Sequence, residues 1–288
     1  MTTFIFLHGS FHAAWNWHRV LPYLERAGHR GLASDLPGHG RNAMKPGKVT
    51  LKRCVDHVLS VMDEVPARED IVLVAHSRNG IVISQTAEAR PERLKGLVYL
   101  AAYLVPNRRS MMEYALEDPQ SLVVRNIEAA LPPKTIRTLT RLFRSGLARA
   151  IGAALLPSAM QMHRLKRAAY REALYHDCGP EIVELANTLL EAEPNWAGFE
   201  PLRITDARFG RVPKAYIECL QDRAVTLPLQ RRMLRDTPCD RVFSMDASHS
   251  PFFSQPERLA DLLLQAVEGF GQEDHSVAAT RNLALAAS

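Results

Sequence analysis

Three residues far apart in the chain have side chains that could together carry out nucleophilic catalysis. Ser77 stands in the segment AHSRNG, Asp222 in the segment CLQDR and His249 in the segment ASHSPF. A serine hydroxyl becomes an effective nucleophile when a histidine accepts its proton, and a carboxylate must orient that histidine and stabilise its cation. The three residue types needed for this chemistry therefore occur in the order serine, acid, histidine.

Ser77 falls where a strand must turn sharply into a helix. The apolar run at residues 71–75 (IVLVA) predicts a buried strand, and a helical pattern follows it. A serine on such a turn can expose its hydroxyl in front of the helix N-terminus. The usual pattern is G-x-S-x-G, and here Ala75 and Asn79 take the glycine positions, with Gly80 next. Taken alone, the serine could also be an ordinary helix N-cap.

Asp222 and His249 also follow predicted strands. Asp222 comes just after the apolar segment 215–220, and His249 comes just after the segment 241–245. Binding residues of open α/β sheets gather in the loops at the carboxyl ends of the strands. Each residue alone could be an ordinary loop residue, but all three together in this order predict a catalytic triad.

The loop after the first predicted strand offers a place for negative charge. Residues 3–8 (TFIFLH) predict a buried strand, and Gly9 lets the following backbone bend over the nucleophile. The backbone N–H groups of Ser10 and Arg78 could then form an oxyanion hole for a tetrahedral intermediate. Phe11 is the alternative donor if the loop is shifted by one residue.

Other polar and aromatic residues near these segments have simpler interpretations. Phe11, His12 and Trp196 are candidates to contact a substrate. Packing or positioning is nevertheless the simpler role for His12 and His76, and Phe11 could equally be a core residue or a pocket wall.

The cysteines and histidines do not predict a metal site. Cys54, Cys178, Cys219 and Cys239 lie far apart without a C-x-x-C pair, and no cluster has metal-ligand spacing. The segment PGHG at residues 37–40 lacks the glycine spacing of phosphate-binding loops. We therefore expect no metal and no cofactor, and ordinary thiols in a reducing compartment.

Short apolar runs alternate with helical patterns in the first third of the chain, which predicts βαβ units and a parallel sheet. The alternation stops near residue 106 and resumes near residue 201. We expect an α/β fold: a doubly wound, mostly parallel sheet of about six strands with an inserted helical cap. The predicted parts are a core of residues 1–106 and 201–270, a cap of residues 107–200 and a flexible tail of residues 271–288. The individual predictions are strands at 3–8, 29–35, 71–75, 97–102, 215–220 and 241–245, and helices at 16–27, from the N-cap Thr50 to about 64, from the HSRNG turn through 89, at 228–235 and at 256–270.

Composition limits the class of protein. The chain has 288 residues, of which 47% are hydrophobic and 23% charged, which is usual for a globular protein. Such a chain can bury a large core without disulfides, so a disordered chain, a collagen-like rod and a disulfide miniprotein are excluded. No signal peptide or membrane-spanning run is visible in the sequence, and we expect a cytoplasmic protein.

Positive charge is concentrated in the predicted cap. Residues 131–175 contain nine Lys or Arg and one acidic residue, Glu172, whereas the whole chain has a net charge of +5. Nucleic-acid binding is not expected, because no reading motif or interleaved aromatic pattern is present. The basic residues could be solvated helix faces, or they could attract an anionic substrate, a carrier protein or a membrane surface. The sequence does not determine the oligomeric state, and a dimer is compatible with it.

The motifs resemble the α/β-hydrolase superfamily, and within it the branch of plant methyl esterases, hydroxynitrile lyases and small bacterial esterases. The resemblance rests on FIFLHGSFHAAWNWHRVLPYLERAGHRGLASDLPGHG, HSRNGIVIS, YIECLQDRAVT and SHSPFFSQPE. It covers residues 1–105 and 212–270, and it implies Ser77, Asp222 and His249 as the triad, with the inserted segment as a lid. Hydroxynitrile lyases of this branch carry a threonine and a lysine where this chain has Gly9 and Ser250, which disfavours cyanohydrin cleavage.

Three functions remain to be compared. The first is a serine hydrolase that cleaves a small carboxylic ester through an acyl-enzyme. The second is a biosynthetic lyase, dehydratase or acyl-transfer enzyme that uses the same triad on an anionic or carrier-bound substrate. The third is a ligand receptor without catalysis, which an intact triad disfavours.

Overall fold

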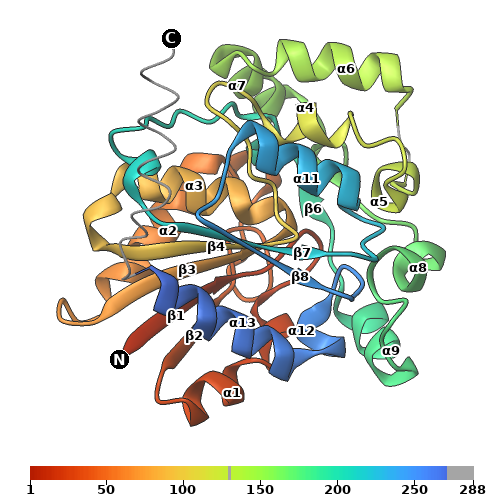
Figure 1. The fold of residues 1–288 in the computed structure, drawn as a ribbon. Coiled ribbons are helices and arrows are strands. Elements are labelled where there is room, and N and C mark those ends of the chain that lie inside the picture. Colours follow the sequence, from red (N-terminus) through yellow and green to blue (C-terminus); the bar gives the residue numbers. More distant parts are fainter. Residues whose placement is uncertain (129–130, 271–288) are drawn as a thin grey trace, which may run out of the picture.

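The computed structural model describes residues 1–128 and 131–270, and its centre is a six-stranded parallel sheet (Figure 1). The strands are ordered β2-β1-β3-β4-β7-β8. Their bounds are Thr2–Leu7 (β1), Arg30–Ser34 (β2), Asp70–His76 (β3), Leu94–Leu100 (β4), Lys214–Cys219 (β7) and Arg241–Met245 (β8). The predicted α/β fold with about six strands is confirmed, and every predicted strand overlaps an observed one.

Helices cover both faces of the sheet, so the central strands are apolar on both sides. Alternate residues of β3 belong to opposite layers of core: Leu73 lies in the cluster that includes residues of α2, α3 and α11, whereas Val74 lies in the cluster that includes residues of α1 and α13. The bounds are Leu21–Arg26 (α1), Leu51–Asp63 (α2), Gly80–Ala89 (α3), Leu227–Asp236 (α11) and Pro256–Gly269 (α13). Thr50 caps α2, because its hydroxyl accepts a hydrogen bond from the Arg53 N–H at 3.2 Å.

The segment between β4 and β7 folds mainly as short helices, which lie at the top and right of Figure 1. Their bounds are Met111–Ala115 (α4), Leu122–Arg125 (α5), Pro133–Leu142 (α6), Gly146–Leu155 (α7), Tyr170–Leu174 (α8), Pro180–Leu189 (α9) and Trp196–Phe199 (α10). We call residues 107–200 the cap. One further short helix, Pro251–Ser254 (α12), precedes α13. The division of the chain into core and cap at residues 106 and 201 stays a prediction.

Two details differ from the sequence predictions. The cap contains a small antiparallel pair, Met162–His163 (β5) with Glu193–Pro194 (β6), where no strand was expected. Strands of two residues are too short to produce a periodic pattern. The helix predicted over residues 16–27 is divided into a 3₁₀ turn and α1, and Pro22 stands in the first turn of α1, where its missing N–H is tolerated.

Within the described ranges, 1–128 and 131–270, no helix has both the length and the apolar character needed to span a membrane. The predicted tail, residues 271–288, lies outside those ranges.

Gly80, the first residue of α3, allows the helix to approach the backbone of Tyr103. A Cβ atom at Gly80 would overlap the Tyr103 carbonyl oxygen, so Gly80→Ala should lower the free energy of unfolding by about 2 kcal/mol. Urea denaturation measures this change. Gly146→Ala is the matched control, since its Cβ would meet nothing closer than 3.8 Å. Equal loss in both variants would contradict the close approach.

Candidate active site

Ser77 directly follows β3 and has a backbone conformation that side-chain-bearing residues rarely adopt. Its φ angle is 56°, in the left-handed region. The turn is held in place by the Tyr103 N–H, which donates a hydrogen bond to the Ser77 carbonyl at 2.9 Å. A 3₁₀ turn at Ser77–Asn79 then leads into α3. The strand therefore turns sharply into a helix at the predicted nucleophile, as the sequence indicates.

Asp222 and His249 contact each other directly. They lie in the loops after the neighbouring strands β7 and β8, and His249 Nδ1–H donates a hydrogen bond to Asp222 Oδ2 at 2.7 Å. The second carboxylate oxygen accepts the N–H groups of Ala224 at 2.7 Å and Val225 at 2.9 Å. Both side chains are buried. The carboxylate therefore fixes the ring, with Nε2 as the nitrogen left to exchange a proton with an alcohol.

His76 joins the turn of Ser77 to the loop of His249. Its Nε2–H donates to the His249 carbonyl oxygen at 2.8 Å, and the two imidazole ring centroids lie 4.3 Å apart. Burial holds the pKa of His76 well below its ordinary value, so the ring is neutral. Because His76 immediately precedes Ser77, this hydrogen bond brings the serine and histidine segments together. Its contacts are those of a positioning residue.

The loop after β1 lies against the turn of Ser77. A Cβ atom at Gly9 would lie 2.5 Å from His76 Nδ1 and 3.0 Å from Ser77 Cβ, so only glycine fits without displacing these side chains. The N–H of Phe11 donates to Glu193 Oε2 at 3.0 Å. That donor is therefore occupied, which favours Ser10 over Phe11 as the predicted oxyanion donor of this loop.

His12 orients the backbone at Ser10. Its Nδ1–H donates to the Ser10 carbonyl at 2.8 Å, and its Nε2 contacts the Tyr175 hydroxyl. Burial lowers the pKa of His12 to about 3, so the ring is neutral at physiological pH. A neutral ring with both nitrogens engaged is suited to holding the loop in place.

Asn79 has a structural use in the position where the usual pattern has glycine. Its Nδ2 donates to the backbone carbonyl of His8 at 2.5 Å. The bond ties the start of α3 to the end of β1, and thus links the two segments that carry the proposed oxyanion donors.

The cap contributes one buried carboxylate that contacts three loops of the core. Glu193 of β6 forms an ion pair with Arg78, and both residues are almost fully buried, at 1% and 4% exposure. The same carboxylate accepts the Phe11 N–H at 3.0 Å and contacts His39 Nε2 at 3.2 Å. Burial lowers the pKa of Arg78 to about 10, which leaves the guanidinium charged at neutral pH. The sequence alone gave no signal for this residue.

Two other buried polar groups, also missed by sequence reasoning, hold the loop of Asp222. Gln230 Nε2 donates to the Val225 carbonyl at 2.7 Å and to Asp222 Oδ2 at 3.4 Å. From the cap, Asp118 accepts the Thr226 N–H at 3.0 Å and the Thr226 hydroxyl at 2.8 Å. The acid loop is therefore fixed from both α11 and the cap.

The predicted substrate-contacting residues are all buried. Trp196 lies inside the cap, where its indole N–H donates to Gln161 Oε1 at 2.8 Å and its ring packs edge-to-face on Phe143. Phe11 and His12 lie in the loop after β1, at 2% and 1% exposure. That any of the three touches a substrate stays a prediction.

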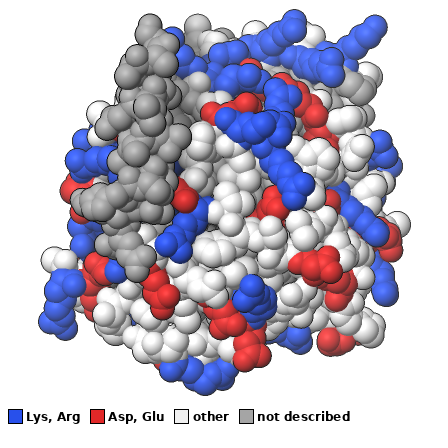
Figure 2. Space-filling view, viewed as in Figure 1, with Lys and Arg blue, Asp and Glu red and all other residues white. Residues whose placement is uncertain are grey.

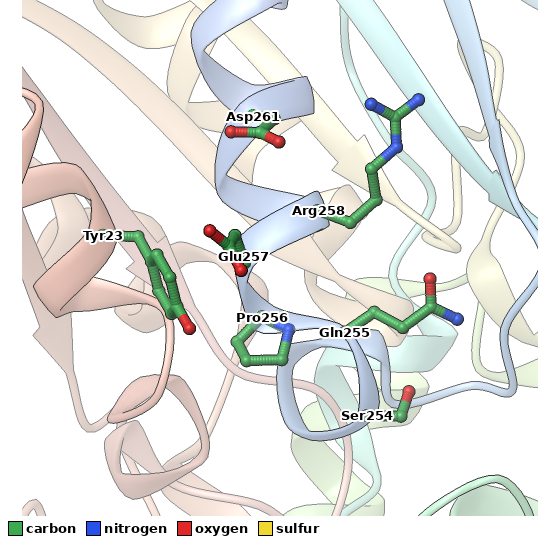
Figure 3. Close-up of a pocket in the computed structure, with 7 residues that line it drawn as sticks. All are labelled: Tyr23, Ser254, Gln255, Pro256, Glu257, Arg258 and Asp261. Carbon is green, nitrogen blue, oxygen red and sulfur yellow. The ribbon is translucent and has the colours of Figure 1, made fainter.

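No cluster of His, Cys, Asp or Glu suited to a metal ion occurs within residues 1–128 and 131–270. Figure 3 shows an open surface hollow at the start of α13, and no triad residue lines it. Its lining residues are Tyr23, Ser254, Gln255, Pro256, Glu257, Arg258 and Asp261.

The chain matches the family described as the alpha/beta hydrolase family over residues 4–262. The chain belongs to the alpha/beta hydrolase family. Within this family, it is 28% identical to Methylesterase 9 of Arabidopsis thaliana, over 94% of this chain and 100% of the relative. It is 29% identical to methyl jasmonate esterase 1 of Vitis vinifera, over 93% and 97% of the two chains. It spans 63% of the length of a longer relative, putative methylesterase 11, chloroplastic, of Arabidopsis thaliana.

Two solved structures of esterases show the same fold. Polyneuridine aldehyde esterase superposes with a TM-score of 0.74 at 22% identity, over 92% of this chain and 98% of that one. A methylesterase from Arabidopsis, MES16, superposes with a TM-score of 0.72 at 23% identity, over 93% and 99%. The relatives are named as methylesterases and a methyl jasmonate esterase, and the two solved structures as esterases.

Replacing Glu193 by glutamine leaves Arg78 as a buried charge without its counter-ion. We expect the free energy of unfolding of E193Q to fall by about 3 kcal/mol, and the added substitution Arg78→Met to recover much of the loss. Chemical denaturation measures both. The control is Glu181→Gln, whose exposed carboxylate lies 4.0 Å from Arg19 and should contribute little. Wild-type stability of E193Q would refute this role of the ion pair.

Proposed function

We propose that this protein hydrolyses a methyl ester of a small carboxylic acid by means of Ser77, His249 and Asp222. The observation that carries the proposal is the 2.7 Å hydrogen bond from His249 to Asp222, together with a serine held at φ 56° on a turn that His76 links to the His249 backbone. The names of the relatives, methylesterase and methyl jasmonate esterase, support the choice of a methyl ester.

Acylation begins when Ser77 Oγ attacks the ester carbonyl carbon and His249 Nε2 takes the hydroxyl proton. The carbonyl oxygen becomes an oxyanion, which the backbone N–H groups of Ser10 and Arg78 stabilise. The intermediate then collapses, the bond from carbon to the alcohol oxygen breaks, and His249 gives its proton to that oxygen, which leaves as methanol. The acyl group remains as an ester of Ser77.

Deacylation repeats the same steps with water. His249 accepts a proton from the attacking water, the oxyanion forms again, and the proton returns to Ser77 Oγ as the acid leaves. Asp222 remains ionised and stabilises the imidazolium in both halves of the reaction. All reacting groups are side chains or water, so the proposed reaction uses no cofactor.

Two alternatives predict different outcomes in simple assays. A lyase, dehydratase or acyl-transfer enzyme could use the same triad, because the fold and triad alone do not determine the reaction. Such an enzyme would be labelled at Ser77 without brisk turnover of simple esters. A non-catalytic receptor would not be labelled. The cytoplasmic location stays a prediction based on sequence.

A fluorophosphonate probe should label the folded protein at Ser77, and the protein should hydrolyse aryl esters and methyl esters. Ser77→Ala should abolish both labelling and hydrolysis. Intact-mass spectrometry measures the adduct, and release of methanol or phenol measures turnover. Ser84→Ala, in the helix that follows, is the matched control and should still be labelled. Failure of the wild-type protein to react with the probe would end the proposal.

Asp222→Asn should lower kcat about ten-thousand-fold, the loss typical of removing the triad carboxylate. The amide can still accept the loop N–H groups, but it no longer stabilises the His249 cation or fixes its tautomer. Steady-state kinetics measure the change. Asp246→Asn is the control, because Asp246 is exposed after β8 and, in the described structure, its carboxylate bonds only to Gln221. A loss of tenfold or less in D222N would show that Asp222 is not the triad acid.

A further inference from the structure

Helix α7 turns a completely apolar face toward solvent. Leu147, Ile151 and Leu155 follow one another at intervals of four residues and are 73%, 50% and 76% exposed. Ala150 and Ala154 lie between them and are also exposed. We call these five residues the outer face of α7.

The opposite side of α7 is fixed by the cap interior, so the helix cannot turn its leucines inward. Arg149 forms an ion pair with Glu200 at 3.5 Å. Gly152 is buried, and a Cβ atom there would lie 2.6 Å from the ring of Trp196. Exposure of the outer face therefore follows from the packing of the inner one.

Further apolar side chains flank the outer face along the chain. Leu142, at the end of α6, is 54% exposed, and Met160, in the turn after α7, is 60% exposed. Single exposed apolar residues are common, but a group of large ones on one element usually marks a contact surface.

The charges within residues 131–161 are all positive, and two of them, Arg144 and Arg149, pair with Glu113 and Glu200 of adjacent segments. Residues 131–161 contain five Lys or Arg and no Asp or Glu. Lys134, Arg137 and Arg141 of α6 are exposed and form no ion pair with the described parts of the chain. In Figure 1 α6 and α7 form the upper edge of the molecule, and Figure 2 shows Lys and Arg side chains gathered along that edge.

The apolar outer face of α7 and the basic side chains of α6 together indicate which kind of partner would bind here. A second copy of this chain would bring an equally basic surface against this one, which is unfavourable. A bilayer with anionic lipids offers both an apolar layer for leucine side chains and negative headgroups for basic ones. We propose that the outer face of α7, with the basic side chains of α6, docks reversibly on an anionic membrane surface.

Sedimentation of the full-length protein with lipid vesicles tests the proposal. The protein should sediment with vesicles of phosphatidylcholine mixed with phosphatidylglycerol, and much less with phosphatidylcholine alone. Each basic side chain near an anionic surface strengthens partitioning about fivefold, so added salt should weaken the binding strongly. Absence of binding to the anionic vesicles would overturn the proposal.

The apolar contribution is tested by replacing Leu147, Ile151 and Leu155 together by glutamine. These side chains are exposed, so the variant should keep its fold and its activity on a water-soluble ester while partitioning falls about tenfold or more. The matched control replaces two exposed apolar residues elsewhere, Leu189 and Val242, and should bind as the wild type does. Unchanged binding of the triple variant would overturn the assignment to this face.

The charge contribution is tested by replacing Lys134, Arg137 and Arg141 by glutamine, which should weaken binding to anionic vesicles about a hundredfold. The matched control removes three exposed arginines outside the cap: Arg26, Arg30 and Arg68. Equal weakening in both variants would show a general charge effect and overturn the proposal.

A competing occupant is a second copy of the chain. Sedimentation equilibrium without lipid distinguishes it: a monomer in solution supports membrane docking. A dimer that the Leu147, Ile151 and Leu155 substitutions dissociate would assign the outer face to self-association and overturn the lipid proposal.

Discussion

The hydrogen bond between His249 and Asp222 is the interaction on which the proposed chemistry depends, and the sheet makes it possible. Strands β7 and β8 are neighbours and parallel, with Cys219 opposite Met245, so the loops that follow them leave the same edge side by side. The loop that carries Asp222 is held in shape by its own backbone N–H groups, which donate hydrogen bonds to the Asp222 carboxylate, and by Gln230, which donates to the loop backbone. In an α/β sheet, residues that are far apart in the chain can therefore meet at the edge where the parallel strands end.

The same edge must also receive the nucleophile, which arrives from β3, two strands away from β7. Hydrogen bonds made by positioning residues connect the segments of the site across this separation. His76 reaches from the turn of Ser77 to the backbone of His249, Asn79 ties the start of α3 to the end of β1, and His12 fixes the backbone of Ser10 within the loop after β1. Buried neutral imidazoles suit this role because burial depresses the pKa of each ring. Rigid polar contacts of this kind keep reacting groups oriented.

The sequence was sufficient where local patterns and the site coincide. Buried parallel strands produce continuous apolar runs, and the turn after each run marks Ser77, Asp222 and His249. It was insufficient where a contact joins distant segments. Glu193 resembles any acidic residue in a helical region, and only the fold shows that it meets Arg78. Strands β5 and β6 were not predicted because a strand of two residues is too short to show a periodic pattern of apolar and polar residues.

The contact of Arg78 with Glu193 also constrains how related sequences can diverge. Arg78 belongs to the turn that carries Ser77, and Glu193 belongs to the cap. Replacing either residue alone would leave the other as a buried charge without a counter-ion. A cap grafted from a homologue without an acid at this place would require an uncharged residue at position 78. A cap and a nucleophile turn taken from different proteins would therefore be compatible only where both residues of this pair are kept or both are replaced.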